Sequence, residues 1–282
     1  MHLIRRLFLR HCLLRNKGLV PQLKVAYSQL FAFRSISREV KTIALGSSHA
    51  HKGFFASAMT QSFNFANSSV DLRLAAGIYS CVEKFWDVSG GNVVLFYDVF
   101  SEGFQTERCS EAYKCIPYEV FYGVHTEFGD KNLQKIADRL KWCQDVLSFP
   151  VEANYRGNND YSWFFPPNTD VEARVLAHLK HSNRGNQQSL FLNDIAELTG
   201  KQGRRFFVVL PPYRSDYSSC LKNGGCWRRG LDEFMGRHGD VRLLNFMADN
   251  DFGDEDFGDS DHLNQGGALK LTAKIIREVE TT

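Results

Sequence analysis

Five short apolar runs are separated by longer segments in which apolar residues recur at three- and four-residue steps. The runs are 42–45, 62–66, 92–97, 205–210 and 241–246. The run 92–97 is almost continuously apolar, which is typical of a strand covered on both faces. Between 70 and 85 the apolar spacing is instead that of one buried helical face. Strands that alternate with helices predict a parallel sheet between two layers of helices.

The other segments are assigned to helices by the same spacing. We expect helices at 51–59, 67–86, 131–147, 169–179, 189–199, 228–237 and 265–279, and one or two more within 1–40. The predicted fold class is therefore α/β, a three-layer α/β/α sandwich with a five-stranded parallel sheet. The least regular part, about 101–188, contains an aromatic loop at 155–167 and a capping-box pattern at 169–172. We interpret it as a helical and loop lid inserted in a single domain, 42–282.

The first 41 residues form a basic segment. They hold nine lysines and arginines and one acid, Glu39, which leaves 25 basic and 31 acidic residues in the rest of the chain. We expect a helical extension over 1–41 that contacts an anionic membrane surface or polysaccharide-synthesis proteins, or that lies as an amphipathic helix on the domain. The overall net charge of +2 indicates no nucleic-acid partner.

Export and metal binding are not expected. Arginines interrupt the apolar residues of 1–20, so the segment lacks the apolar core of a signal peptide, and no run is long enough to span a bilayer. This predicts a cytoplasmic protein, with a peripheral position on the inner membrane as the alternative. The seven cysteines are scattered without Cys-x-x-Cys spacing, which favours free thiols and no metal site. The acidic tract 249–261 lacks the glycine and glutamate positions of a calcium-binding loop and is expected to be a solvated loop.

Two polar motifs at strand ends are the candidates for chemistry. Gly46-Ser47-Ser48 directly follows the first strand, and Asp259-Ser260-Asp261-His262 comes after the last one. The carboxyl ends of parallel strands meet at one edge of the sheet, so Ser48 and His262 are expected to face each other there. A carboxylate three residues before the histidine can fix the ring while the other ring nitrogen faces the serine hydroxyl.

These motifs resemble two blocks of the SGNH (GDSL-type) hydrolase superfamily. Gly46-Ser47-Ser48 is similar to the first block, with Ser47 in place of the usual aspartate, and Asp259-x-x-His262 matches the last block. The resemblance covers 42–280 and implies a flavodoxin-like sheet, with Ser48 as nucleophile, His262 as base and Asp259 as the orienting acid.

The resemblance also implies an oxyanion hole, which the middle blocks support less well. Its expected donors are the amides of Ser48 and Ala66, the latter in place of the family's glycine. The family's Gly-x-Asn-Asp block is missing, so the third donor is open between Asn67, Ser101 and another backbone amide. One such donor is typically worth a few kcal/mol of transition-state stabilisation.

Several neighbouring residues have two interpretations. Asp261 is the alternative orienting acid. His49 and His51 flank the serine, and Arg214 follows the fourth strand. Each of these three is either a substrate contact or an ordinary loop residue, and Ser101 is a further candidate substrate contact.

The resemblance is to members of bacterial surface-polysaccharide gene sets, which act on sugar O-acyl esters. It implies a serine-dependent O-acetyltransferase or esterase that acts on a surface polysaccharide or its precursor. Such an enzyme needs no bound cofactor, and acetyl-CoA is the donor expected for transfer. The alternative is a catalytically inactive SGNH-like protein that binds a glycan or serves as a scaffold in polysaccharide assembly.

Overall fold

A single parallel sheet of five strands forms the centre of the protein in a computed structural model. The structure describes residues 5, 9–10, 13–14, 16–59, 61–157, 160–166, 170–182, 188–221 and 227–281. The strands are β1 (Thr42–Leu45), β2 (Ser62–Asn64), β3 (Asn92–Phe96), β4 (Arg205–Leu210) and β5 (Arg242–Asn245). They lie in the order β2-β1-β3-β4-β5, and every neighbouring pair is parallel. The predicted α/β class and the five-stranded parallel sheet are confirmed.

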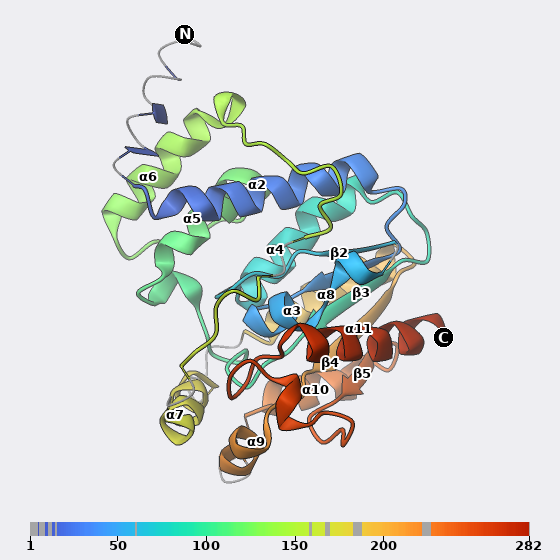
Figure 1. The fold of residues 1–282 in the computed structure, drawn as a ribbon. Helices are drawn as coiled ribbons and strands as arrows, with labels where there is room; N and C mark the ends of the chain where they lie inside the picture. Colours follow the sequence, from blue (N-terminus) through green and yellow to red (C-terminus); the bar gives the residue numbers. More distant parts are fainter. Residues whose placement is uncertain are drawn as a thin grey trace.

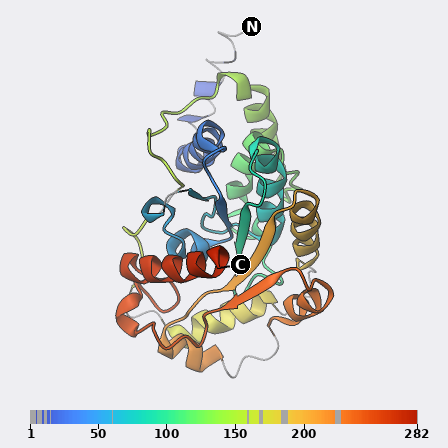
Figure 2. The same cartoon turned by 90° about the vertical axis from the view of Figure 1, so that its right-hand side faces the viewer.

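Helices cover both faces of this sheet. On one face lie α3 (Ser48–Gly53) and α11 (Gln265–Glu280), and on the other α4 (Leu72–Val82), α8 (Leu190–Lys201) and α10 (Arg229–Arg237) (Figures 1 and 2). Successive strand residues point to opposite faces, so the adjacent Ile43 and Ala44 belong to two different apolar clusters. The three-layer arrangement therefore follows from strands such as β1 and β3, which bury adjacent apolar residues on opposite faces of the sheet.

Several predicted helices have different bounds in the structure. The expected helix 67–86 begins only at Leu72, because the Asp71 carboxylate caps it by accepting from the Leu74 amide at 2.8 Å. It ends in a separate 3-10 turn, Glu83–Phe85. The expected helix 51–59 begins earlier, at Ser48, and is followed by the 3-10 turn Ala56–Ala58. Similarly, the expected 131–147 becomes α6 (Lys131–Trp142) and a 3-10 turn at Gln144–Val146.

The segment 101–188 contributes to two different parts of the molecule. Its first half forms short 3-10 turns (Thr106–Arg108 and Ala112–Cys115), α5 (Ile116–Tyr122) and α6, and this half packs beside α2. Its second half supplies the loop 160–166 and α7 (Val171–Ser182), which lies against α9 (Ser215–Leu221) at the other end of the molecule (Figure 1). Thr169 of the expected capping box lies outside the described residues, whereas Asp170 accepts from the Ala173 amide at 3.0 Å. The expected single lid is therefore divided between two places in the fold.

The expected amino-terminal extension is largely α2 (Leu19–Ile36), which belongs to the core of the domain. The fully buried ring of Phe33 makes edge contacts with Phe63, Phe65 and Trp86. The Gln29 amide donates to the carbonyls after β2. Of the two expectations for this segment, the structure shows a helix packed on the domain. No helix among the described residues has the length and apolar character needed to cross a bilayer.

Candidate active site

The motif after β1 makes a sharp turn into α3. Gly46 has a φ of +135°, and a side chain there would come within 3.2 Å of the Phe96 carbonyl and 3.0 Å of Ala50 Cβ. Glycine is therefore required both for the backbone conformation and for the close approach to β3. The turn places Ser48 at the first position of α3, beyond the carboxyl end of β1 and next to the central strand β3.

Ser48, His262 and Asp259 form a continuous chain of hydrogen bonds. The Ser48 Oγ lies 2.8 Å from His262 Nε2, and His262 Nδ1 lies 3.0 and 3.1 Å from the two Asp259 oxygens. Because Asp259 accepts at Nδ1, the neutral ring carries its proton there, which leaves Nε2 to take the serine proton. This is the arrangement of nucleophile, general base and orienting acid.

Asp259 is itself held by three backbone amides. It accepts from His262 N at 2.8 Å, Asp261 N at 3.1 Å and Phe165 N at 3.1 Å. Burial alone raises the pKa of Asp259, but its hydrogen bond to His262 and the charge of that ring outweigh burial and lower the pKa overall. The group is therefore a carboxylate at neutral pH, as its role requires.

Asp261, the alternative orienting acid, has different partners. Its Oδ1 is 3.8 Å from His262 Nδ1, and its two oxygens accept from Arg174 Nε at 2.5 Å and Nη2 at 2.8 Å. Burial raises the pKa of Asp261, but the surrounding positive groups lower it well below its usual value. Asp259 is therefore the acid that bonds the catalytic ring, and Asp261 connects that region to α7.

His49 is not a substrate contact. It is 4% exposed and lies between two carboxylates, with Nδ1 3.1 Å from Asp98 and Nε2 3.3 Å from Asp261. Asp98 also accepts from the Ser47 hydroxyl. Burial by itself lowers the pKa of His49, but the charges of Asp98 and Asp261 outweigh it and raise the pKa from its ordinary 6.5 to about 10. The sequence-based suggestion that His49 contacts substrate is wrong.

This shifted pKa predicts a pH-dependent contribution to stability. The folded-state pKa of His49 is raised, so its stabilisation is complete below about pH 6.5 and is lost as the pH rises to about 10. The free energy of unfolding of the wild type should therefore exceed that of His49→Gln most at pH 6 and progressively less towards pH 10. Urea unfolding at five pH values measures this difference, and a difference that is constant with pH would contradict it.

Among the described residues, one group has ligand atoms spaced for a metal ion: His49, Asp261 and His262, within 4.8 Å of one another. The Asp261 and His262 atoms already have hydrogen-bond partners, and the His49 nitrogens lie at ion-pair distance from Asp98 and Asp261. Arg174 binds both Asp261 oxygens, and Ser48 and Asp259 engage the two nitrogens of His262. A guanidinium against the carboxylate also disfavours a second cation there, so the chemistry of this donor set is that of a charge cluster.

Some of the expected oxyanion donors already donate to an acceptor within the protein. The Ser48 amide begins α3, and within the described part of the chain it has no acceptor. The Ala66 amide, in contrast, donates to Asn64 Oδ1 at 2.9 Å, so the sequence-based assignment of Ala66 as an open donor is wrong. Asn67 lines the same cavity as Ser48, and its Oδ1 accepts from the Ser68 amide. Its side-chain N–H₂ pairs with the Tyr118 hydroxyl and has a second N–H, so Asn67 as an oxyanion donor stays a prediction.

Ser101 and Arg214 are not brought to the catalytic chain. The Ser101 hydroxyl accepts from the Asp98 amide at 2.8 Å and closes a turn. The Arg214 guanidinium forms a two-pronged pair with Asp216 at 2.9 and 2.6 Å. Neither residue lines the cavity at Ser48, so both have structural roles.

A cavity of about 740 Å³ opens on Ser48 and His262. Its lining includes four aromatic side chains, Phe100, Phe104, Trp163 and Phe165. It also includes Ser69, Glu111 and Lys114, whose side chains are joined by hydrogen bonds and an ion pair. The volume and the mixed lining suit a small ligand with one apolar face and several hydroxyl groups.

The loop 160–166 is fastened over this cavity by Lys52, which is 2% exposed. Its ammonium donates to the carbonyls of Asp160 at 2.7 Å and Trp163 at 2.6 Å and lies 4.1 Å from the centre of the Phe164 ring. Tyr161 returns a hydrogen bond to the Lys52 carbonyl at 2.9 Å. Since Lys52 is one helical turn from Ser48, the same short helix holds the nucleophile and the loop.

Replacing Lys52 with methionine should release this loop. Two charge-assisted hydrogen bonds are lost, each worth about 1.5–3 kcal/mol. We expect amide hydrogen exchange in 160–166 to accelerate by at least about tenfold while exchange in β1 and β3 stays as in the wild type. Lys84→Met, at an exposed lysine, is the matched control. Unchanged exchange in the loop would show that Lys52 does not fasten it.

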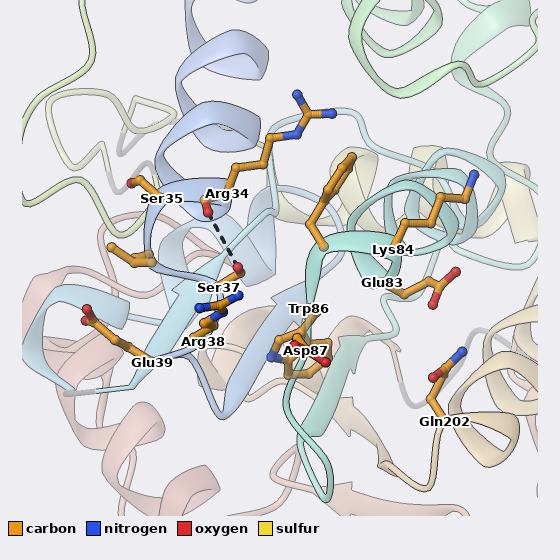
Figure 3. Close-up of a pocket in the computed structure, with 12 residues that line it drawn as sticks. Arg34, Ser35, Ser37, Arg38, Glu39, Glu83, Lys84, Trp86, Asp87 and Gln202 are labelled. Atoms are coloured by element: carbon orange, nitrogen blue, oxygen red, sulfur yellow. Dashed lines mark hydrogen bonds between the residues drawn. The ribbon is translucent and has the colours of Figure 1, made fainter.

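A second cavity, of about 960 Å³, lies at the opposite end of the sheet. Figure 3 shows its lining at the end of α2 and in residues 83–87, with charges of both signs such as Arg34, Lys84, Glu39 and Asp87. Trp86 of this region donates to the carbonyl of Val40, which precedes β1. This cavity is therefore remote from the carboxyl ends of the strands, and its lining residues do not form a catalytic site.

Comparison with known proteins finds no family model that matches the chain and no curated protein with significant sequence similarity. The functional argument therefore rests on the geometry of Ser48, His262 and Asp259 and on the cavity beside them.

Proposed function

We propose that the protein is a serine-dependent acyl-ester enzyme of the SGNH type. The observation that carries the proposal is the unbroken chain from Ser48 through His262 to Asp259, which opens on a cavity at the carboxyl ends of the strands. Sequence-distant residues with these roles have little structural reason to meet in this order unless the serine is activated.

The first half-reaction acylates the serine. Ser48 Oγ attacks the acyl carbonyl carbon while its proton passes to His262 Nε2. The oxyanion that forms accepts from the Ser48 amide and from Asn67. Collapse of the intermediate breaks the bond to the leaving oxygen or sulfur, which receives the proton from His262 Nε2, and the acyl group remains on Ser48.

The second half-reaction decides between hydrolysis and transfer. Water or a sugar hydroxyl attacks the acyl carbonyl, and His262 accepts its proton and returns it to Ser48. We propose a surface polysaccharide or its precursor as the saccharide, with acetyl-CoA as the donor for transfer. A lining that combines aromatic side chains such as Phe100 and Trp163 with polar ones such as Lys114 supports a sugar ring, which has an apolar face and hydroxyl edges.

One observation favours a second candidate, an inactive SGNH-like protein that binds a glycan or acts as a scaffold. The Ala66 amide is already bonded to Asn64, and no Gly-x-Asn-Asp block supplies another donor. An oxyanion hole with fewer donors lowers the rate by about 10²–10³ per missing donor, which could leave binding without turnover.

A fluorophosphonate probe separates these two functions. The enzyme should be labelled, and mass spectrometry should locate the adduct on the peptide that contains Ser48. Labelling elsewhere, or none, would count against the proposed mechanism and favour the scaffold. If Ser48 is labelled, acetyl-CoA hydrolysis is compared with and without saccharide acceptors, and acceleration by an acceptor identifies a transferase.

A further inference from the structure

His49 lies beside the catalytic base but takes no part in the chain of hydrogen bonds from Ser48. Its ring stacks on the His262 ring, with centroids 4.7 Å apart and an angle of 21° between the planes. Tyr213 contacts it edge-on at 5.4 Å. Both of its nitrogens face carboxylates, Asp98 after β3 and Asp261 in the loop after β5. One ring therefore connects three strand ends at the site.

We infer that a buried imidazolium at His49 positions the catalytic base, by pairing with Asp98 and Asp261 at once while its face supports His262. This inference rests on the proposed function, since it assigns His49 to the machinery of that site. His49 touches neither the serine nor the cavity. It is therefore a positioning residue and not a catalytic one.

The number of ring protons is the first argument. The two ring nitrogens lie at ion-pair distance from two different carboxylates, 3.1 Å from Asp98 and 3.3 Å from Asp261, although neither contact has the direction of a hydrogen bond. A neutral ring brings one N–H and no charge to two anions, whereas the doubly protonated ring has an N–H and positive charge on both sides. These distances therefore favour the charged ring.

The balance of buried charge is the second argument. Asp98 and Asp261 are each at most 1% exposed. Arg174 pairs with Asp261, and the only other bond to the Asp98 carboxylate within the described residues comes from the neutral Ser47 hydroxyl. A charged His49 gives Asp98 a cation and makes the cluster neutral overall. An unpaired buried carboxylate would cost several kcal/mol.

The remaining groups that face His49 do not supply this charge. Tyr213, from the loop after β4, keeps its phenol proton because burial raises its pKa. His178, from α7, is neutral because burial lowers its pKa to about 3, and so is His51, on the same helix, at about 4. Phe100 is apolar. The charged groups around the ring are thus Asp98, Asp261, Arg174 and, behind His262, Asp259.

The charge on His49 should also set the pH at which the site becomes reactive. A cation stacked on His262 opposes a second proton on that neighbouring ring. His49→Gln removes the cation and leaves the carboxylates, so the pH at which the site becomes reactive should rise. The midpoint of the rise in labelling rate with pH should move up by about one to two pH units. In His49→Gln/Asp98→Asn one anion is removed with the cation, and the midpoint should return to within about half a unit of the wild type.

The first measurement uses the wild-type protein and needs neither a variant nor activity. Nitrogen-15 spectra of its histidines, recorded from pH 6 to 9, should contain one ring with both nitrogens protonated up to pH 9. The absence of any ring that keeps the imidazolium pattern above pH 8 would overturn the inference, even if the protein is an active esterase.

The second measurement is the pH dependence of fluorophosphonate labelling in the wild type, His49→Gln, the double variant and His238→Gln. His238 is a remote histidine that stacks on Phe234, and its substitution should leave the midpoint unchanged. A midpoint unchanged in His49→Gln, or not restored in the double variant, would overturn the inference. If His49→Gln does not fold, the nitrogen-15 spectra of the wild type test the inference without it. A wild type without labelling would contradict the proposed function and not the charge on His49.

Discussion

Replacing His262 with alanine should lower kcat/KM for an O-acyl ester by about 10⁴-fold or more, because Ser48 loses the group that accepts its proton. Ser48→Ala should have a comparable effect. The double variant should be no worse than either single one, since the two residues act as one unit. Asp259→Asn should also cost about 10⁴-fold, because an amide facing Nδ1 favours the wrong ring tautomer.

These variants are compared by hydrolysis of a small chromogenic acetyl ester and by circular dichroism. Arg214→Ala is the matched control, since Arg214 was a sequence-level candidate whose guanidinium pairs with Asp216, away from the cavity. It should retain activity within about threefold. A Ser48→Ala protein that keeps more than a hundredth of the wild-type rate would contradict the assignment of the nucleophile.

Phe33→Ala should be the most destabilising single truncation in α2, at about 3–5 kcal/mol. The ring is fully buried against Phe63 and Trp86, so its removal leaves a cavity between α2 and the sheet. Phe31→Ala, on the exposed side of the same helix, should cost less than about 1.5 kcal/mol. Urea unfolding measures both values. Equal small effects would mean that α2 is only loosely attached to the domain.

The positions of the strands along the chain were predictable because a run of apolar residues is a local feature of the sequence. Runs such as 205–210 and 42–45 are apolar after their first residue, and the structure gives both the bounds predicted from the sequence. The missed helices, α5 and α9, are only seven residues long, too short for an apolar period to be recognised. Asp71 was missed as a cap because Asn67, four residues earlier, has the same capping chemistry.

The candidate site was predictable only where its residues lie in local motifs. Ser48, Asp259 and His262 come from two short motifs at strand ends, and the structure brings the three together. The contact of Arg174 with Asp261 and those of Lys52 with the loop join residues about 90 to 110 positions apart, where no periodic signal exists. The role of Ala66 depended on the acceptor of one backbone amide, which a sequence does not specify.

One hydrogen bond links the loop over the cavity to the carboxylate that orients the catalytic base. Phe165, in the loop over the cavity, donates its peptide N–H to Asp259. If the loop lifts to exchange ligands, Asp259 loses one of the three amides that stabilise its charge. The carboxylate that orients His262 is then less firmly held. The amides of Asp261 and His262 still hold Asp259, so the reactivity of Ser48 should fall when the loop lifts and be highest while the loop is down.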